Sequence, residues 1–116
     1  MLVRIAGHEI RIELERNPSV DALRALLQKA PLYIRMKDFA QMEKFGDLGV
    51  KLPAEDETIT TGPGDVILSE GRLFVIYYAS NTWRFTRLGK VVGMDAEGLK
   101  QALGNVSADA ELLLLE

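Results

Sequence analysis

The chain has 116 residues and a formal net charge of −3, from 14 lysines and arginines and 17 aspartates and glutamates. It has no cysteine, which excludes disulfides, thiolate metal sites and cysteine nucleophiles and fits a reducing compartment. The length predicts one domain over residues 1–116, and we expect it in the cytoplasm because no signal peptide or membrane-length apolar run is present. The charges are interspersed, so they give no long-range field that would attract nucleic acid.

The beginning of the chain predicts a hairpin followed by a helix. Apolar residues occupy alternate positions over 9–15, and residues 2–6 pair with this strand across Gly7-His8, where glycine can adopt a positive φ. Asn17-Pro18 supplies a capping oxygen and a first-turn proline. The three- and four-residue apolar spacing that follows predicts an amphipathic helix over 18–29.

The middle of the chain predicts four more strands and one long connection. Alternating apolar residues predict a strand over 32–37, and a shorter one is expected over 42–45. A second hairpin is expected over 65–68 and 72–78, and its last strand is apolar on both faces, which places it in the middle of the structure. Residues 51–64 have the composition of an irregular loop, which at this length is either functional or disordered.

The end of the chain predicts a strand, a helix and a strand. Segment 86–95 predicts a strand that ends in glycine, 96–103 a short capped helix, and 110–115 an apolar strand that has to be paired and covered. Many strands with few helices favour a closed antiparallel sheet, because closure removes the edges and two helices can cover the ends. The sequence therefore predicts a mainly β closed barrel capped by two short helices.

Two motifs resemble those of a known family. The segment 86–95, which contains Leu88-Gly89-Lys90-Val91-Val92-Gly93-Met94, resembles the Phe-Gly-Lys-Val-x-x-Gly-Met segment of the cyclophilins, with one residue fewer between Val91 and Gly93. A second pattern is especially similar to small prokaryotic cyclophilin-like proteins and is formed here by Tyr78, Asn81, Trp83 and Arg87-Leu88-Gly89-Lys90. The resemblance is closest over 64–103, and it implies a cyclophilin-like antiparallel barrel with two capping helices.

The resemblance also sets expectations about activity. It aligns Arg35 with the arginine that cyclophilins use to stabilise a twisted prolyl amide, but Ala40-Gln41, Glu43 and Phe85 stand where the family has Phe-Met, glutamine and histidine. Trp83 is only near the position of the family tryptophan. We therefore expect a non-catalytic module that binds a small molecule or peptide. The alternatives are a weak peptidyl-prolyl cis-trans isomerase and an interaction subunit of a redox protein, since some similar domains occur beside redox proteins.

Aromatic, amide and arginine side chains in segments 33–43 and 78–87 predict a recognition groove, because aromatics give contact area at small entropy loss while arginine and asparagine orient a ligand. In the competing, structural interpretation Trp83 and Phe85 cover the barrel end and Arg87 pairs with a carboxylate such as Glu43. Glu43 is also expected to lie beside Arg35. The candidate binding residues are Arg35, Phe39, Glu43, Tyr78, Asn81, Trp83, Phe85 and Arg87.

Nothing in the sequence predicts a metal or a cofactor. His8 is the single histidine and lies in an expected turn, and the consecutive carboxylates of 55–57 point in different directions without the spacing of a cation loop. Gly62-Pro63-Gly64 precedes a strand, so it predicts a turn and not a phosphate-binding loop. The expected partner is an unknown small molecule, a peptide or a redox protein, with no nucleic acid and no membrane.

Overall fold

The computed structural model describes residues 1–104 and 107–115 as a β-structure with two helices. The helices are α1 (Pro18–Lys29) and α2 (Ala96–Leu103). The strands are β1 (Leu2–Ile5), β2 (His8–Leu14), β3 (Leu32–Phe39), β4 (Glu43–Asp47), β5 (Glu57–Thr61), β6 (Asp65–Ser69), β7 (Leu73–Tyr77), β8 (Asn81–Val92) and β9 (Ala108–Leu113).

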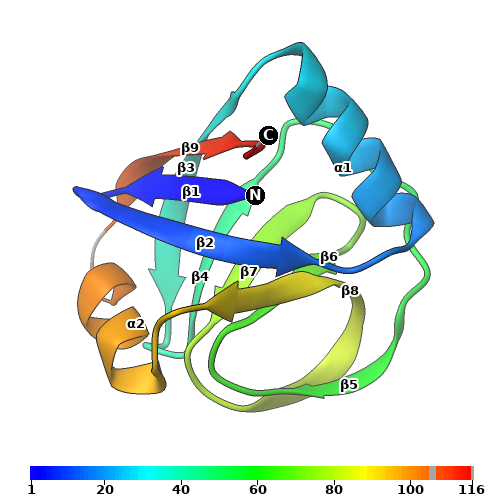
Figure 1. Ribbon diagram of the computed structural model, residues 1–116. Helices are drawn as coiled ribbons and strands as arrows, with labels where there is room; N and C mark the ends of the chain where they lie inside the picture. The colour runs from blue at the N-terminus through cyan, green and yellow to red at the C-terminus, as the bar shows by residue number, and fades with distance from the viewer. Residues whose placement is uncertain (105–106, 116) are drawn as a thin grey trace.

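Eight of these strands close into an antiparallel barrel (Figure 1). The order β2-β1-β9-β3-β4-β7-β6-β8 returns to β2, because β8 also pairs with β2 from Arg11↔Val92 to Leu14↔Gly89. A Cβ at Gly89 would lie 2.2 Å from the carbonyl oxygen of Glu13, so the two backbones can approach this closely only at a glycine. The predicted closed antiparallel barrel is confirmed.

The two helices cover opposite ends of the barrel (Figure 1). The Asn17 side chain caps α1 by accepting from the backbone N–H of Val20 at 2.9 Å, and Asp95 caps α2 by accepting from Gly98 at 2.7 Å. Each helix buries an apolar stripe in the barrel core, which includes Leu23 from α1 and Leu99 from α2. Both helices predicted from the sequence are confirmed.

The first hairpin forms as predicted, with its turn displaced by one residue. β1 ends at Ile5 and β2 begins at His8, so the connection is Ala6-Gly7 and not Gly7-His8. Both turn residues have positive φ, 50° at Ala6 and 79° at Gly7, as hairpins with two-residue loops require. The displacement arises because Ala6 accepts a conformation that usually favours glycine or asparagine.

The segment 51–64, expected as an irregular loop, contains the strand β5. β5 pairs with the first half of β8, from Glu57↔Phe85 to Thr61↔Asn81. Ile59 of β5 contributes its side chain to a second core on the outside of the barrel wall. This second core is formed by Ile59, Ile67, Val75, Tyr77 and Phe85. β7 therefore lies between two cores, which confirms that it is a central strand with two apolar faces.

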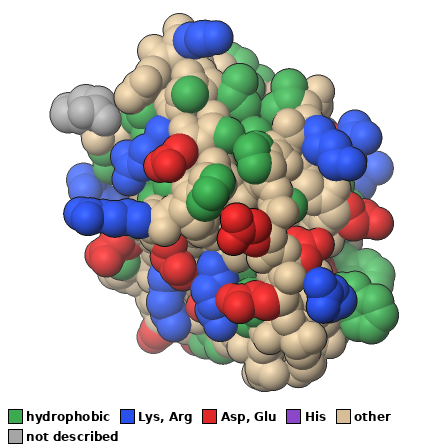
Figure 2. Space-filling model, turned by 90° about the vertical axis from the view of Figure 1, so that its right-hand side faces the viewer, with side chains coloured by type: hydrophobic (Ala, Val, Ile, Leu, Met, Phe, Trp, Pro, Cys, Tyr) green, Lys and Arg blue, Asp and Glu red, His purple; other side chains and the backbone are tan. Residues whose placement is uncertain are grey.

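The surface carries both signs of charge. On the face shown in Figure 2, acidic and basic side chains are intermingled, with hydrophobic groups between them. No helix in the described part of the chain has the length and apolar character needed to cross a bilayer.

Candidate functional site

Four side chains from four strands form a row across the outer wall of the barrel. Phe39 at the end of β3 is paired with Glu43 at the start of β4, and Glu43 is paired with Tyr77 at the end of β7. Directly opposed residues of antiparallel strands place their side chains on the same face of the sheet. The row continues to Asn81 at the start of β8, whose side-chain amide donates a 2.9 Å hydrogen bond to the Tyr77 hydroxyl.

Two tight connections hold the ends of this row. The turn between β3 and β4 uses Ala40 and Gln41, both with positive φ, and the side chain of Asp38 accepts from the backbone N–H of Gln41 at 2.9 Å. At the other end the Thr61 hydroxyl donates to the backbone oxygen of Asn81 and accepts from its N–H, at 3.1 and 3.0 Å. Strand ends fixed in this way give a rigid site.

The row borders an apolar hollow of about 220 Å³ lined by Phe39, Glu43, Phe45 and Leu73. Phe39 is 55% exposed, which is unusual for a large apolar side chain on a strand. Phe45 and Leu73 are partly buried and pack against the second core, so the floor of the hollow is fixed. An apolar surface with one carboxylate at its edge can hold an apolar group and orient it by a single polar contact.

Tyr77 and Glu43 shift each other's ionisation. Burial raises the pKa of the Glu43 carboxyl, the hydrogen bond from Tyr77 lowers it, and the charge of Asp38 raises it. Burial also raises the pKa of Tyr77 to about 12, with the Asn81 hydrogen bond opposing this shift and Glu43 adding to it. The hydroxyl of Tyr77 therefore stays protonated near neutral pH, as a donor to Glu43 that itself accepts from Asn81.

The structure brings together some of the candidate residues and separates others. Phe39, Glu43 and Asn81 belong to the row, and Trp83 is 68% exposed on the same face of β8 as Asn81, two residues further along the strand. Phe85 is buried in the second core, where its ring centroid lies 5.8 Å from that of Tyr77. Phe85 is therefore a packing residue, but it lies under β5 on the outer wall and not over the barrel end.

Three candidates lie away from the hollow or point elsewhere. Tyr78 is buried in the barrel core, and its hydroxyl donates to Asp38 inside the barrel. Arg35 pairs with Asp109 at 3.3 Å, so the expected contact with Glu43 is replaced by one with β9. Arg87 lies 3.9 Å from Glu57, not beside Glu43 as expected, because its position on β8 is next to β5.

Three residues at or behind the hollow were not among the candidates. They are Phe45, Leu73 and Tyr77. The alternation along 73–77 places Leu73 and Tyr77 on one face, and Phe45 follows Glu43 at the spacing of two that keeps both on one face of a strand. Only the pairing between β4 and β7 brings the two faces together.

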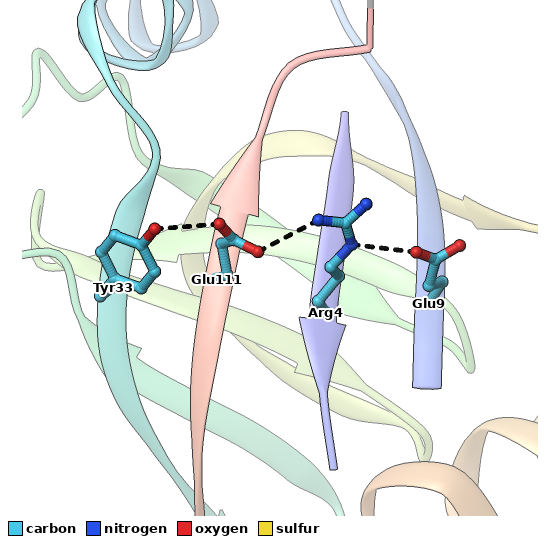
Figure 3. Close-up of polar contacts among 4 residues, drawn as sticks. All are labelled: Arg4, Glu9, Tyr33 and Glu111. Carbon is cyan, nitrogen blue, oxygen red and sulfur yellow. Dashed lines mark hydrogen bonds and ion pairs between the residues drawn. The ribbon is translucent and has the colours of Figure 1, made fainter. Parts of the chain in front are cut away.

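A larger hollow, of about 420 Å³, lies on the wall formed by β2, β1, β9 and β3. Its charged groups satisfy one another (Figure 3): Arg4 contacts Glu9 at 2.9 Å and Glu111 at 3.4 Å, and the Tyr33 hydroxyl donates to Glu111 at 3.0 Å. These contacts give Arg4 a raised pKa, through Glu9 first and then Glu111. A surface ladder of this kind leaves few unsatisfied groups for a ligand.

A third hollow, of about 190 Å³, lies where α1 begins and includes Arg87, Glu57 and Thr86 among its lining residues. The Thr86 hydroxyl donates to Asp56 at 2.7 Å, and the Asn17 amide donates to the backbone oxygen of Arg87 at 2.8 Å. These contacts join the 51–64 segment and the start of α1 to β8. The third hollow is thus lined by groups that hold the fold together.

Comparison with known proteins identifies the family. The family model described as the Cyclophilin-like family matches residues 3–114, which is nearly the whole chain. Comparisons with curated proteins and with solved structures found no match. Among the described residues no group of three or more histidine, cysteine, aspartate or glutamate side chains is placed to hold a metal ion. The chain, a closed antiparallel barrel with two capping helices, belongs to the Cyclophilin-like family.

Proposed function

We propose that this domain is a non-catalytic binding module that holds a small molecule or a short peptide on the outer wall of its barrel. The observation that carries the proposal is the hollow in which exposed Phe39 stands beside half-buried Glu43. Large aromatic side chains on rigid strands are efficient anchors, because little side-chain freedom is lost when a ligand covers them.

The polar end of the row supports the same proposal. The Asn81 amide donates to the Tyr77 hydroxyl, and Tyr77 favours the ionised form of Glu43 at the edge of the hollow. Trp83, exposed on the same face of β8, supplies a second aromatic surface close to Asn81. An apolar group and an oriented polar group are what a selective small-ligand site requires.

A weak prolyl isomerase is the second candidate, favoured by the family to which the chain belongs. That activity needs a donor beside an apolar pocket, to stabilise the twisted amide. Arg35 is four residues from Phe39 along β3, about 13 Å at the usual rise of a strand, and it pairs with Asp109. This separation favours binding without catalysis. The absence of cysteine fits a reducing compartment, so we propose that the module acts in the cytoplasm.

A thermal-shift series tests the proposal. The probes are indole, benzyl alcohol and short peptides that contain an X–Pro bond, applied to the wild type, to Phe39→Ala and to the matched control Tyr33→Ala. Tyr33 is also an exposed aromatic on the outer face of β3, but it lines the larger hollow. We expect at least one probe to raise the Tm of the wild type and of Tyr33→Ala, because a ligand of the native state stabilises it, and not that of Phe39→Ala.

Other results would overturn the proposal. A Tm shift that survives in Phe39→Ala and disappears in Tyr33→Ala would place binding in the other hollow. Faster cis-trans exchange of an X–Pro peptide that is lost in Arg35→Ala would establish the isomerase instead. Co-purification of a redox protein with the domain, without any Tm shift from the probes, would support the interaction subunit.

A further inference from the structure

The Glu43 carboxylate combines burial with spare acceptor capacity. The Tyr77 hydroxyl donates one hydrogen bond to it, whereas an ionised carboxylate offers about four acceptor sites. Glu43 is also one of the four residues that line the apolar hollow. Its remaining acceptor sites are therefore available at the edge of that hollow.

No cation of the described residues neutralises this carboxylate. The ion pairs of those residues use Glu9, Glu57, Glu111 and three aspartates, Asp47, Asp65 and Asp109. Lys44, next in sequence to Glu43, points into the barrel and is fully buried. Lys37 stands opposite Phe45 on the outer wall, where its side chain is exposed.

The electrostatic surroundings favour a positive group. Asp38, whose side chain contacts Tyr78 on the inside of the barrel, acts on Glu43 through the wall, and its negative charge disfavours ionisation of Glu43. The faces of aromatic rings also attract cations, and two of the four lining residues are phenylalanines. A cation in the hollow would thus be attracted by one carboxylate directly, by a second at longer range and by the rings.

We propose that the hollow selects a small ammonium ligand with a short apolar arm, the nitrogen bound to Glu43 and the arm packed on Phe39, Phe45 and Leu73. The inference rests on the proposed binding function and specifies its ligand class. A hollow of about 220 Å³ suits a single ring or a branched chain with one amino group, and not a larger cofactor. Tyr77 and Asn81 act as positioning residues, because they reach the ligand only through Glu43.

A pair of nearly isosteric probes tests the ligand class. Benzylamine, which is protonated at pH 7, and benzyl alcohol differ in charge and little in shape. We expect benzylamine to bind the wild type about tenfold more tightly, since its positive charge adds an ionic attraction to Glu43 to the apolar contact and hydrogen bond that both probes can make. In Glu43→Gln the two dissociation constants should become equal, with that of benzyl alcohol unchanged, because glutamine keeps the size of the side chain and loses its charge.

The outcomes separate the ligand class from the binding function. Equal affinities in the wild type, or a preference for benzylamine that persists in Glu43→Gln, would overturn the proposed ligand class and leave the binding function standing. Absence of binding by both probes at millimolar concentration would count against the binding function itself. Phe39→Ala is the second variant, and it should weaken both probes alike while the Tm without ligand stays close to that of the wild type.

Discussion

Tyr77 and Tyr78 are consecutive in the chain, and they hold Glu43 from opposite faces of the barrel wall. On the outside the Tyr77 hydroxyl acts on the Glu43 carboxyl and lowers its pKa, and on the inside the Tyr78 hydroxyl lies 3.0 Å from the Glu43 backbone oxygen. The backbone N–H of Tyr78 also donates to Met42 at 2.9 Å. Successive residues of a strand face opposite sides of the sheet. Tyr77 therefore acts on the side chain of Glu43, and Tyr78 contacts its main chain.

Tyr77→Phe removes the hydroxyl between Asn81 and Glu43. Since the Tyr77 hydrogen bond lowers the pKa of Glu43, its loss should raise that pKa further, as measured by a ¹³C NMR titration of the Glu43 carboxyl. The unfolding free energy should fall by about 1 kcal/mol, because the half-buried amide of Asn81 loses its acceptor. Tyr33→Phe, at a hydroxyl whose ring is 72% exposed, should cost less than about 0.5 kcal/mol. An unchanged Glu43 pKa in Tyr77→Phe would contradict the account.

Trp83 and Phe85 lie on the same face of β8 but differ in burial, so they form a matched pair. Phe85→Ala should destabilise the protein by about 3–4 kcal/mol, because it empties part of the second core. Trp83→Ala should cost less than about 1 kcal/mol, because the indole is largely exposed. Urea unfolding measures both values. A loss of similar size in the two variants would mean that Trp83 is part of the core and not a ligand anchor.

Gly89→Ala should open the barrel at its closure. The added Cβ would overlap the carbonyl oxygen of Glu13, so β2 and β8 would have to separate, at a cost of about 3 kcal/mol or more. Gly93→Ala is the control, because the position just after β8 has open space around a Cβ and a φ of 80°, which costs on the order of 1 kcal/mol. Thermal or urea unfolding measures the stability of both variants. If Gly89→Ala lowers the free energy of unfolding less than Gly93→Ala does, the close approach of β2 and β8 is refuted.

Lys44 is fully buried inside the barrel, and its ammonium nitrogen has no hydrogen-bond partner among the described residues. Burial lowers the pKa of Lys44, and Asp38, which is opposite in register, partly restores it. Lys44→Met should therefore stabilise the protein by about 1–2 kcal/mol at pH 7, because an unpartnered polar group is replaced by an apolar one of similar length.

The gain from Lys44→Met should depend on pH. Lysine titrates near 10.4 in an unfolded chain, so between the lowered pKa of the folded state and about 10.4 the unfolded wild type holds the extra proton. The wild type then becomes more stable as pH rises through this window, and the advantage of Lys44→Met shrinks. Urea unfolding between pH 6 and pH 9 measures the change, with Lys37→Met as the exposed control. A destabilised Lys44→Met would show that the ammonium has an essential partner.

Much of the fold follows from local signals. The capping residues Asn17 and Asp95 predict where the two helices begin. The spacing of apolar residues predicts most of the strands, where it is two, and the helices, where it is three and four. β5 escaped prediction because it buries only Ile59 and Thr61 and stands between an acidic run and a Gly-Pro-Gly turn. Its Thr-Ile-Thr-Thr sequence has β-branched residues throughout, but such a signal is weak without a partner strand.

The site depends on strand pairing that a single sequence does not contain. Phe39, Glu43 and Asn81 were among the candidates, yet their alignment in one row comes from the pairing of β3 with β4, of β4 with β7 and from the Asn81 contact. A shift of one residue would exchange Tyr77 and Tyr78 between the two faces. The sequence alone therefore does not decide which of the two tyrosines faces the outer wall, and the structure places Tyr77 there and Tyr78 in the barrel core.

The most direct test of the account is to locate a bound probe on the barrel wall. In a ¹H–¹⁵N NMR titration with benzylamine, the largest chemical-shift changes are expected at the residues that line the proposed hollow, Phe39, Glu43, Phe45 and Leu73. Largest changes at Arg4, Tyr33 and Glu111 instead would place binding in the other hollow and contradict the central claim.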